Sequence, residues 1–402
     1  MNDYIGLVAA AVSLAVALAT VSFLGPHLGM QLVSGRAAPI DGLRGYAAFF
    51  VFISHAAAWF YFVRTGRWAV TPLRAYGNLG SVSVVVFFMI TAFLFTTKLL
   101  DSRNGTIDWL RMLVSRFMRL TPLYLFAMAA LLMLVDILSG FERSVAWPAL
   151  LTSVPAWLGF TLAGAPDVNG VHDTWLIIAG VTWSLRYEIF FYLLLPVLAV
   201  LTRAPAPRGW IVVVCMVLAM IIFAARLTPM LVAPFLGGML AAWLVRVPRL
   251  REWARTSTAS VLALGAFVGV IALSRGAFKV GPLAVLSFAF FVVAAGHSLF
   301  GILSNRSARL LGEVSYSVYL LHAMILFALV NWGIGVQKLA SMSSPLYWSL
   351  IVGVTPPLIA LCMITFVRIE KPGIENTARI SGSLRRLFER RSTVTANGKR
   401  RL

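Results

Sequence analysis

The chain has 402 residues, of which 60% are hydrophobic and only 12% are charged, and its mean hydropathy is +0.88. This composition excludes a soluble globular domain, because a soluble chain of this length has too little interior to bury so much apolar surface. The formal net charge of +20 would suggest nucleic-acid binding in a soluble protein, but in a membrane protein it first indicates which loops face the cytoplasm.

Long apolar stretches predict the membrane spans, each of which needs about 20 mostly apolar residues. In chain order, the predicted helices cover residues 4–24, 43–63, 79–100, 120–139, 174–201, 209–225, 228–246, 258–274, 280–301, 311–335 and 346–367. The stretch 147–165 is also apolar, but Pro148, Pro155 and several glycines interrupt it, which predicts a re-entrant or interfacial segment. The expected fold class is an all-α polytopic membrane protein with about eleven transmembrane helices.

The positions of Lys and Arg in the loops predict the orientation of these helices. Loops on one side carry far more of these cations, and that side is expected to be cytoplasmic. The N-terminus then lies outside and the C-terminus inside, and the alternation holds only if 147–165 does not cross. The basic segment 374–402 is expected to be a disordered cytoplasmic tail. Most of the net charge reflects topology and attraction to anionic lipid, so no nucleic-acid partner is expected.

The second predicted helix carries two ionisable residues of a kind that membrane spans rarely contain. Arg44 lies in its first turn, where Asp41 can cap the helix, and His55 follows almost three turns later. Both side chains therefore share one face, about 16 Å apart along the axis, with His55 near the middle of the bilayer. Each residue also has a structural explanation, Arg44 as a snorkelling anchor and His55 as a hydrogen-bonded helix contact.

Six short blocks follow one another along the chain. They are DGLRGYAAFFVFISH (41–55), GSVSVVVFFMITAFLFT (80–96), RFMRLTPLYL (116–125), TWSLRYEIFFYLLLPV (182–197), LGEVSYSVYLLH (311–322) and EKP (370–372). In this order they resemble the acyltransferase-3 family of integral-membrane acyltransferases, over about residues 36–373. The chain departs from the family pattern at Val85 and Val86, where an acid is frequent, and at Ile189, where a second acid often follows Glu188.

The resemblance implies a membrane-bound O-acyltransferase with a core of about ten helices, to which residues 1–35 add one helix and a linker. Such enzymes move an acyl group, usually acetyl, from cytoplasmic acyl-CoA to a hydroxyl of a cell-surface glycan, such as lipopolysaccharide or exopolysaccharide, or of a lipid-linked sugar. Acyl-CoA is then a co-substrate, and no permanently bound cofactor or metal is expected. The expected location is a bacterial inner membrane, in contact with membrane lipid.

The arginines of these blocks are expected to bind the donor. Arg116 and Arg119 are spaced i,i+3, and Arg111 lies in the same loop. Arginine binds phosphate through paired N–H donors, so these three side chains are predicted to hold the phosphates of acyl-CoA. Arg44 is expected to hold a further phosphate or the pantetheine end. A general excess of positive charge at the cytoplasmic face would also explain arginines here.

Catalysis is expected at His55 and Glu188. His55 would act either as a general base on the acceptor hydroxyl or as a nucleophile that carries the acyl group. Glu188, whose i+4 neighbour is Tyr192, would orient or charge-balance His55 or bind acceptor hydroxyls. Further candidates for acceptor binding or support are Arg186, Tyr192, Tyr316, Tyr319 and His322, the last three forming a polar stripe that is as often structural as functional.

The main alternative is a transporter that moves protons or a small solute along the same intramembrane His, Glu and Arg residues. Such transporters often contain paired repeats with interrupted helices, and the sequence has no internal repeat. A receptor or scaffold has no ligand-binding or signalling domain to support it. The ordered blocks therefore favour the enzyme.

Overall fold

The structure, a computed structural model, describes residues 4–32, 38–68, 71, 73–103, 105–205 and 228–387. Regular structure in these ranges is helical throughout, which confirms the all-α prediction. Within them, seven helices are long and apolar enough to cross a membrane, or eight if the bent pair Pro229–Leu244 and Pro248–Ala254 is one span. The chain is therefore a polytopic membrane protein. The predicted span 209–225 lies outside the described residues, and the count of about eleven stays a prediction.

The helices follow one another along the chain with short connections. Their bounds are α1 Tyr4–His27, α2 Ala38–Thr65, α3 Arg74–Asp101, α4 Trp109–Leu138, α5 Trp147–Leu158, η1 Thr174–Ile178, α6 Trp183–Leu201, α8 Pro229–Leu244, α9 Pro248–Ala254, α10 Ser257–Leu273, α11 Val280–Ala294, α12 Arg306–Glu313, α13 Ser315–Ala328, η2 Leu329–Ile334, α14 Val336–Ser341, α15 Ser344–Thr365, η3 Phe366–Glu370 and α16 Lys371–Glu375.

The span predicted for residues 174–201 is not one helix. A 3-10 turn, η1, occupies its start, and α6 begins only at Trp183. The break occurs where Ala179 and Gly180 adopt left-handed backbone, with φ of 46° and 64°. The conformation costs alanine more than glycine, so the surrounding contacts must enforce it.

Two apolar segments are shorter than a membrane crossing. α11 ends at Ala294, whereas the prediction placed its end near residue 301. α5 has 12 residues, too few for the hydrocarbon core, which agrees with a segment that does not cross.

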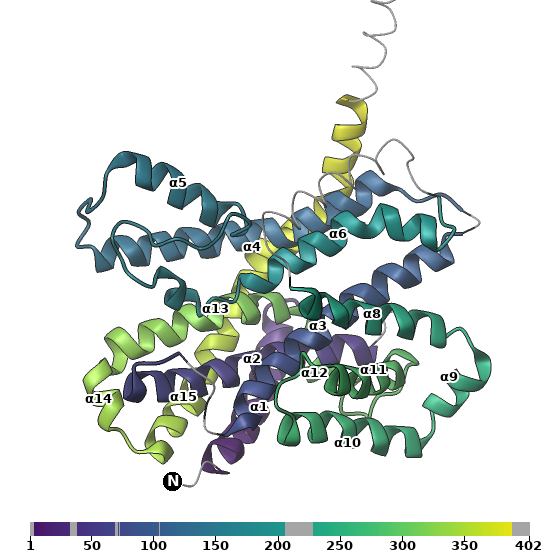
Figure 1. Ribbon diagram of the computed structural model, residues 1–402, viewed down its shortest axis with the longest axis horizontal. Coiled ribbons are helices and arrows are strands. Elements are labelled where there is room, and N and C mark those ends of the chain that lie inside the picture. Colours follow the sequence, from purple (N-terminus) through teal and green to yellow (C-terminus); the bar gives the residue numbers. More distant parts are fainter. Residues whose placement is uncertain are drawn as a thin grey trace, which may run out of the picture.

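The helix α2 lies near the centre of the molecule, with α3, α12 and α13 packed against it (Figure 1). The helix α1 packs against α15 and α12, so the N-terminal helix joins this bundle. The turn η1 packs on α13, and α6 packs on α3. Residues of α2, α3, α6 and α13 can therefore meet in one place.

Glycines allow α2 and α12 to approach closely. A Cβ atom at Gly312 would lie 2.0 Å from the carbonyl oxygen of Asp41, and one at Gly45 would lie 2.6 Å from the nitrogen of Gly312. Any other residue would push the helices apart, as at other small-residue contacts in membranes. The close approach lets Arg44 donate to the carbonyl oxygen of Gly312 from Nη2, at 2.8 Å, and from Nε, at 3.1 Å.

Asp108 caps α4 and also contacts the C-terminal segment. Its Oδ1 accepts the backbone N–H of Arg111 at 3.0 Å, and its Oδ2 accepts from Arg385 at 2.7 Å. The expected disordered tail is thus largely helical up to Leu387, and residues 388–402 lie outside the described residues. The backbone N–H of Arg111, together with Arg385, holds the pKa of the Asp108 carboxyl below its usual value.

Replacing Asp108 with alanine is expected to lower the free energy of unfolding by about 1 kcal/mol, because α4 loses its cap. Asp108→Asn keeps an oxygen for the cap and removes only the exposed ion pair, so it should cost less. Since the folded-state pKa is depressed, the contribution is present above about pH 4 and is lost as pH falls through the folded value. Thermal unfolding in detergent tests this, and equal losses in both variants would contradict a capping role.

Candidate functional site

Two histidines that are 267 positions apart in sequence meet between α2 and α13. His55 Nδ1 lies 2.8 Å from Nε2 of His322, and the two rings stack with centroids 5.1 Å apart. His322 Nδ1 lies 2.7 Å from the carbonyl oxygen of Val318. His322 is fully buried, whereas His55 is partly exposed. We call this arrangement the histidine pair.

The hydrogen bonds assign the protons of the neutral histidine pair. A carbonyl oxygen only accepts, so Nδ1 of His322 must donate to Val318. Nε2 of His322 is then an acceptor, and His55 must donate to it from Nδ1. The other nitrogen of His55, Nε2, is left with a lone pair. That atom can take a proton from a hydroxyl or attack a carbonyl carbon.

A cavity between α2, α3, α4, α6 and α13 brings together most of the predicted site residues. Three arginines lie in its wall beside one carboxylate, in a setting largely enclosed by apolar side chains. Charges in such a setting interact more strongly than in water, so the cavity suits an anionic ligand. We call it the basic cavity; its polar lining is Arg44, Thr91, Arg116, Arg119, Ser184, Glu188, Tyr192, Ser315, Tyr316 and Tyr319.

Glu188 belongs to the basic cavity and not to the histidine pair. Its Oε1 accepts a hydrogen bond from the hydroxyl of Tyr192, the neighbour predicted from i,i+4 spacing. Among charged groups, Arg116, Arg119 and Arg44 act on it. The partner of His55 is His322, so the expectation that Glu188 orients His55 is not met by a direct contact.

A second cavity adjoins the basic cavity, because Leu94, Phe95 and Arg116 line both. Its other cations are Lys98 and Arg111. Arg116 also lies over the ring of Phe95, with its guanidinium carbon 5.2 Å from the ring centroid. Cations thus follow a path from Arg111 to Arg44.

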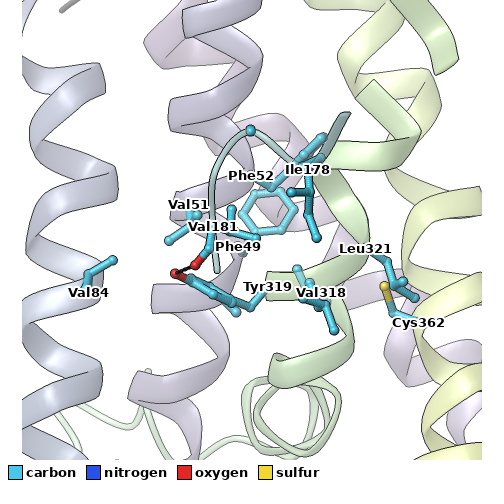
Figure 2. Close-up of a cluster of buried hydrophobic side chains, with 14 of the residues drawn as sticks. Phe49, Val51, Phe52, Val84, Ile178, Val181, Val318, Tyr319, Leu321 and Cys362 are labelled. Atoms are coloured by element: carbon cyan, nitrogen blue, oxygen red, sulfur yellow. Dashed lines mark hydrogen bonds between the residues drawn. The ribbon is translucent and has the colours of Figure 1, made fainter. Parts of the chain in front are cut away.

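Tyr319 lies between the basic cavity and the histidine pair. Its hydroxyl donates to the carbonyl oxygen of Val181 at 3.0 Å and lies 2.7 Å from the hydroxyl of Ser184 (Figure 2). Its ring centroid is 6.5 Å from that of His322 and 5.7 Å from that of Phe87, on the cavity wall. Since it lines the cavity and faces the histidine pair, Tyr319 divides the two.

The remaining predicted residues have other positions. Tyr316 donates to the carbonyl oxygen of Leu120 at 3.2 Å at the wall of the basic cavity. Arg186 does not line that cavity, and its buried Nε atom has no hydrogen-bond partner among the described residues. In the same part of the chain, no group of three or more His, Cys, Asp or Glu side chains is placed to hold a metal ion.

Two residues that the sequence analysis did not select also lie at the site. Ser184 contacts Tyr319, and its signal was its place in the block that starts at Thr182. Trp68 lies against His55, with ring centroids 6.2 Å apart. It follows the end of α2, and no local pattern shows that the chain folds back there.

Comparisons with known proteins agree with this site. The family described as "Acyltransferase domain", the acyltransferase-3 family, matches residues 38–367. The chain is 30% identical over 329 residues to acyltransferase MdmB of Streptomyces mycarofaciens, covering 72% of this chain and 79% of that protein. It is 27% identical to exopolysaccharide production protein ExoZ of Rhizobium meliloti, over 69% of this chain and 87% of that protein.

A third relative is nodulation protein 10 of Rhizobium leguminosarum bv. viciae, 24% identical over 85% of this chain and 94% of that protein. No solved structure matches the chain. The family match covers most of the chain, including both histidines and the basic cavity. The chain therefore belongs to the acyltransferase-3 family and is an acyl-transferring membrane enzyme, which argues against the transporter alternative.

Proposed function

We propose that this enzyme transfers an acyl group, most simply acetyl, from cytoplasmic acyl-CoA to a hydroxyl of a cell-surface glycan or lipid-linked sugar. The observation that carries the proposal is the path of cations that leads to a histidine with an available nitrogen lone pair. The acceptor class follows from a relative named for exopolysaccharide production.

The donor is proposed to occupy the two adjoining cavities. Its phosphates would contact Arg111, Arg116 and Arg119, and its pantetheine arm would extend past Arg44 towards Tyr319. Arg44 is already fixed by Gly312, so it offers a preorganised charge at low entropic cost. Glu188 and Tyr192 would orient the arginine side chains. Tyr319 would turn away from Val181 to let the thioester reach His55.

In the first of two possible routes, His55 Nε2 removes the proton of the acceptor hydroxyl while the oxygen attacks the thioester carbonyl. A C–O bond forms, the C–S bond breaks, and the proton on His55 passes to the departing CoA thiolate. His322 would hold the ring and share the developing positive charge. In the second route, His55 Nε2 itself receives the acyl group and then passes it to the hydroxyl. Acetylated protein accumulating without acceptor would identify the second route.

We propose the topology that the loop cations predict, with about eleven spans, the N-terminus outside and the C-terminus in the cytoplasm. The cations of the second cavity then lie at the cytoplasmic end, and they include Lys98 and Arg111. This placement suits a donor that is synthesised in the cytoplasm and is too polar to enter lipid. The bacterial inner membrane is the proposed location.

Replacing Arg116 and Arg119 together with alanine is expected to raise the KM for acetyl-CoA by about 10²-fold. Each lost hydrogen bond to a charged group costs about 1.5–3 kcal/mol. The kcat should change much less, because neither arginine contacts the histidine pair. Thiol release from acetyl-CoA by the purified protein in nanodiscs measures both constants.

Arg249→Ala is the matched control, because Arg249 is exposed on α9 and lines neither cavity. Its KM for acetyl-CoA should equal that of the wild type. If the double variant also kept the wild-type KM, the phosphate-binding role of Arg116 and Arg119 would be wrong.

A further inference from the structure

A group of aromatic rings covers His55 on the side away from the basic cavity. Trp68 lies 6.2 Å from His55 between ring centroids, and it contacts Trp59 at 5.3 Å, Phe62 at 5.5 Å and Trp175 at 5.8 Å. We call these four residues the aromatic cluster. Trp68, Phe62 and Trp175 are partly exposed. The cluster lies towards the end of α2 that is far from Arg44 and its cavity.

Trp59 leaves a polar group of this cluster without a partner. Its side chain is 3% exposed, and its indole N–H has no hydrogen-bond acceptor among the described residues. An unsatisfied buried donor costs about 1–3 kcal/mol, and such groups in native proteins call for an explanation. An oxygen-bearing ligand at the cluster would supply the acceptor.

The segment that carries Trp175 is held rigidly. The Thr174 hydroxyl accepts the backbone N–H of Val168 at 3.0 Å and donates to the carbonyl oxygen of Val171 at 2.7 Å. The indole N–H of Trp175 donates to Oδ1 of Asp173 at 2.9 Å, and Asp173 has a left-handed backbone with φ of 53°. Strained backbone held by a network of hydrogen bonds is typical of ligand-binding sites.

A hollow with many polar groups lies beside the cluster. Phe327 connects the two, because it lines the hollow and its ring centroid is 6.0 Å from that of Trp59. The hollow offers hydroxyl, amide, imidazole and carboxylate groups and no Lys or Arg in its lining. Its polar residues are Ser139, Ser144, Asn169, His172 and Asp173.

The chemistry of the two faces of His55 therefore differs. The basic cavity suits a polyanion, whereas the cluster and the hollow combine ring faces with neutral or acidic hydrogen-bonding groups. A few placed polar groups among aromatic side chains are what small-molecule sites use to fix orientation. A polyanionic donor would be repelled by Asp173, but an uncharged polyhydroxylated ring would find acceptors there and an apolar wall on Trp68 and Trp175.

We infer that the aromatic cluster and the adjoining hollow form the acceptor subsite, which takes an uncharged pyranose ring and presents one hydroxyl to His55 Nε2 from the face opposite the donor. The inference rests on the proposed function. The proton and electron movements are those given for the transfer to a hydroxyl. Trp68 is the residue that lies between the sugar and His55, and Trp175 is the second wall.

The test uses the full-length protein in nanodiscs with acetyl-CoA and octyl β-glucoside, an uncharged pyranoside with a lipid-like chain. Mass spectrometry follows acetylated octyl glucoside, and a thiol reagent follows CoA. Trp68→Ala and Trp175→Ala are expected to raise the KM for octyl glucoside at least tenfold while the KM for acetyl-CoA stays within twofold. Trp175→Phe, which keeps an aromatic face, should recover most of the affinity.

Trp147→Ala is the control, because Trp147 is an exposed tryptophan that stacks only with Arg143 and lies outside the hollow's lining. An unchanged KM for octyl glucoside in both Trp68→Ala and Trp175→Ala would overturn the inference. Equal acetylation of 1-octanol, or none of the glucoside, would overturn the choice of a pyranose ring. Absence of any CoA release by the wild type would instead refute the proposed function itself.

Discussion

Replacing His55 with glutamine is expected to lower kcat for thiol release from acetyl-CoA by about 10³-fold, within the range that general-base catalysis contributes. Glutamine can still donate to Nε2 of His322, so the packing of α2 on α13 is kept while the basic nitrogen is lost. The affinity for acetyl-CoA should not change, because His55 is not part of the basic cavity. Calorimetric binding and thiol release, measured on the same preparation, separate these two quantities.

His297→Gln is the matched control for this variant. His297 pairs with Ser260 and does not contact the histidine pair. It should therefore keep wild-type turnover. Normal turnover in His55→Gln would show that the reaction centre lies elsewhere.

Replacing His322 with leucine is expected to lower kcat by about 10²-fold or more with little effect on donor affinity. His55 would lose the acceptor that fixes its Nδ1–H and leaves Nε2 unprotonated, which is the role that a buried partner plays for a catalytic histidine. His322 is a positioning residue in this account, since its own nitrogens are both occupied by Val318 and His55. Steady-state kinetics with calorimetry measures the split between kcat and affinity.

The conservative variant His322→Gln distinguishes positioning from simple packing. The glutamine side-chain oxygen can accept from His55 Nδ1, so this variant should recover at least tenfold of the kcat that leucine loses. Equal losses in the two variants, with thermal stability lowered in both, would indicate that His322 only fills space between α2 and α13.

The sequence predicted the fold class and the convergence of several site residues. Arg44 and His55 were placed on one face by helical spacing, and the Glu188–Tyr192 hydrogen bond followed from i,i+4 geometry. These are contacts within one helix, whose geometry is known in advance. The arginines of α4 were found because anion binding requires their chemistry.

Other parts of the site depend on contacts between distant segments and could not be predicted in this way. The bond between His55 and His322 depends on how α2 packs against α13, and the Gly45–Gly312 approach that brings α12 onto α2 has no local signature. Glu188 was paired with His55 because residues 174–201 read as one helix. The break at Ala179 and Gly180 places a carbonyl acceptor, Val181, beside Tyr319 instead.

The most direct test of the account is acyl transfer from acetyl-CoA in sealed proteoliposomes in which all molecules have one orientation. Acetyl-CoA is supplied to one side at a time, and trypsin access to the arginine-rich C-terminal segment identifies that side. The account predicts thiol release only when acetyl-CoA and the C-terminal segment are on the same side, and none from His55→Gln. Release from the opposite side alone, or undiminished release by His55→Gln, would contradict it.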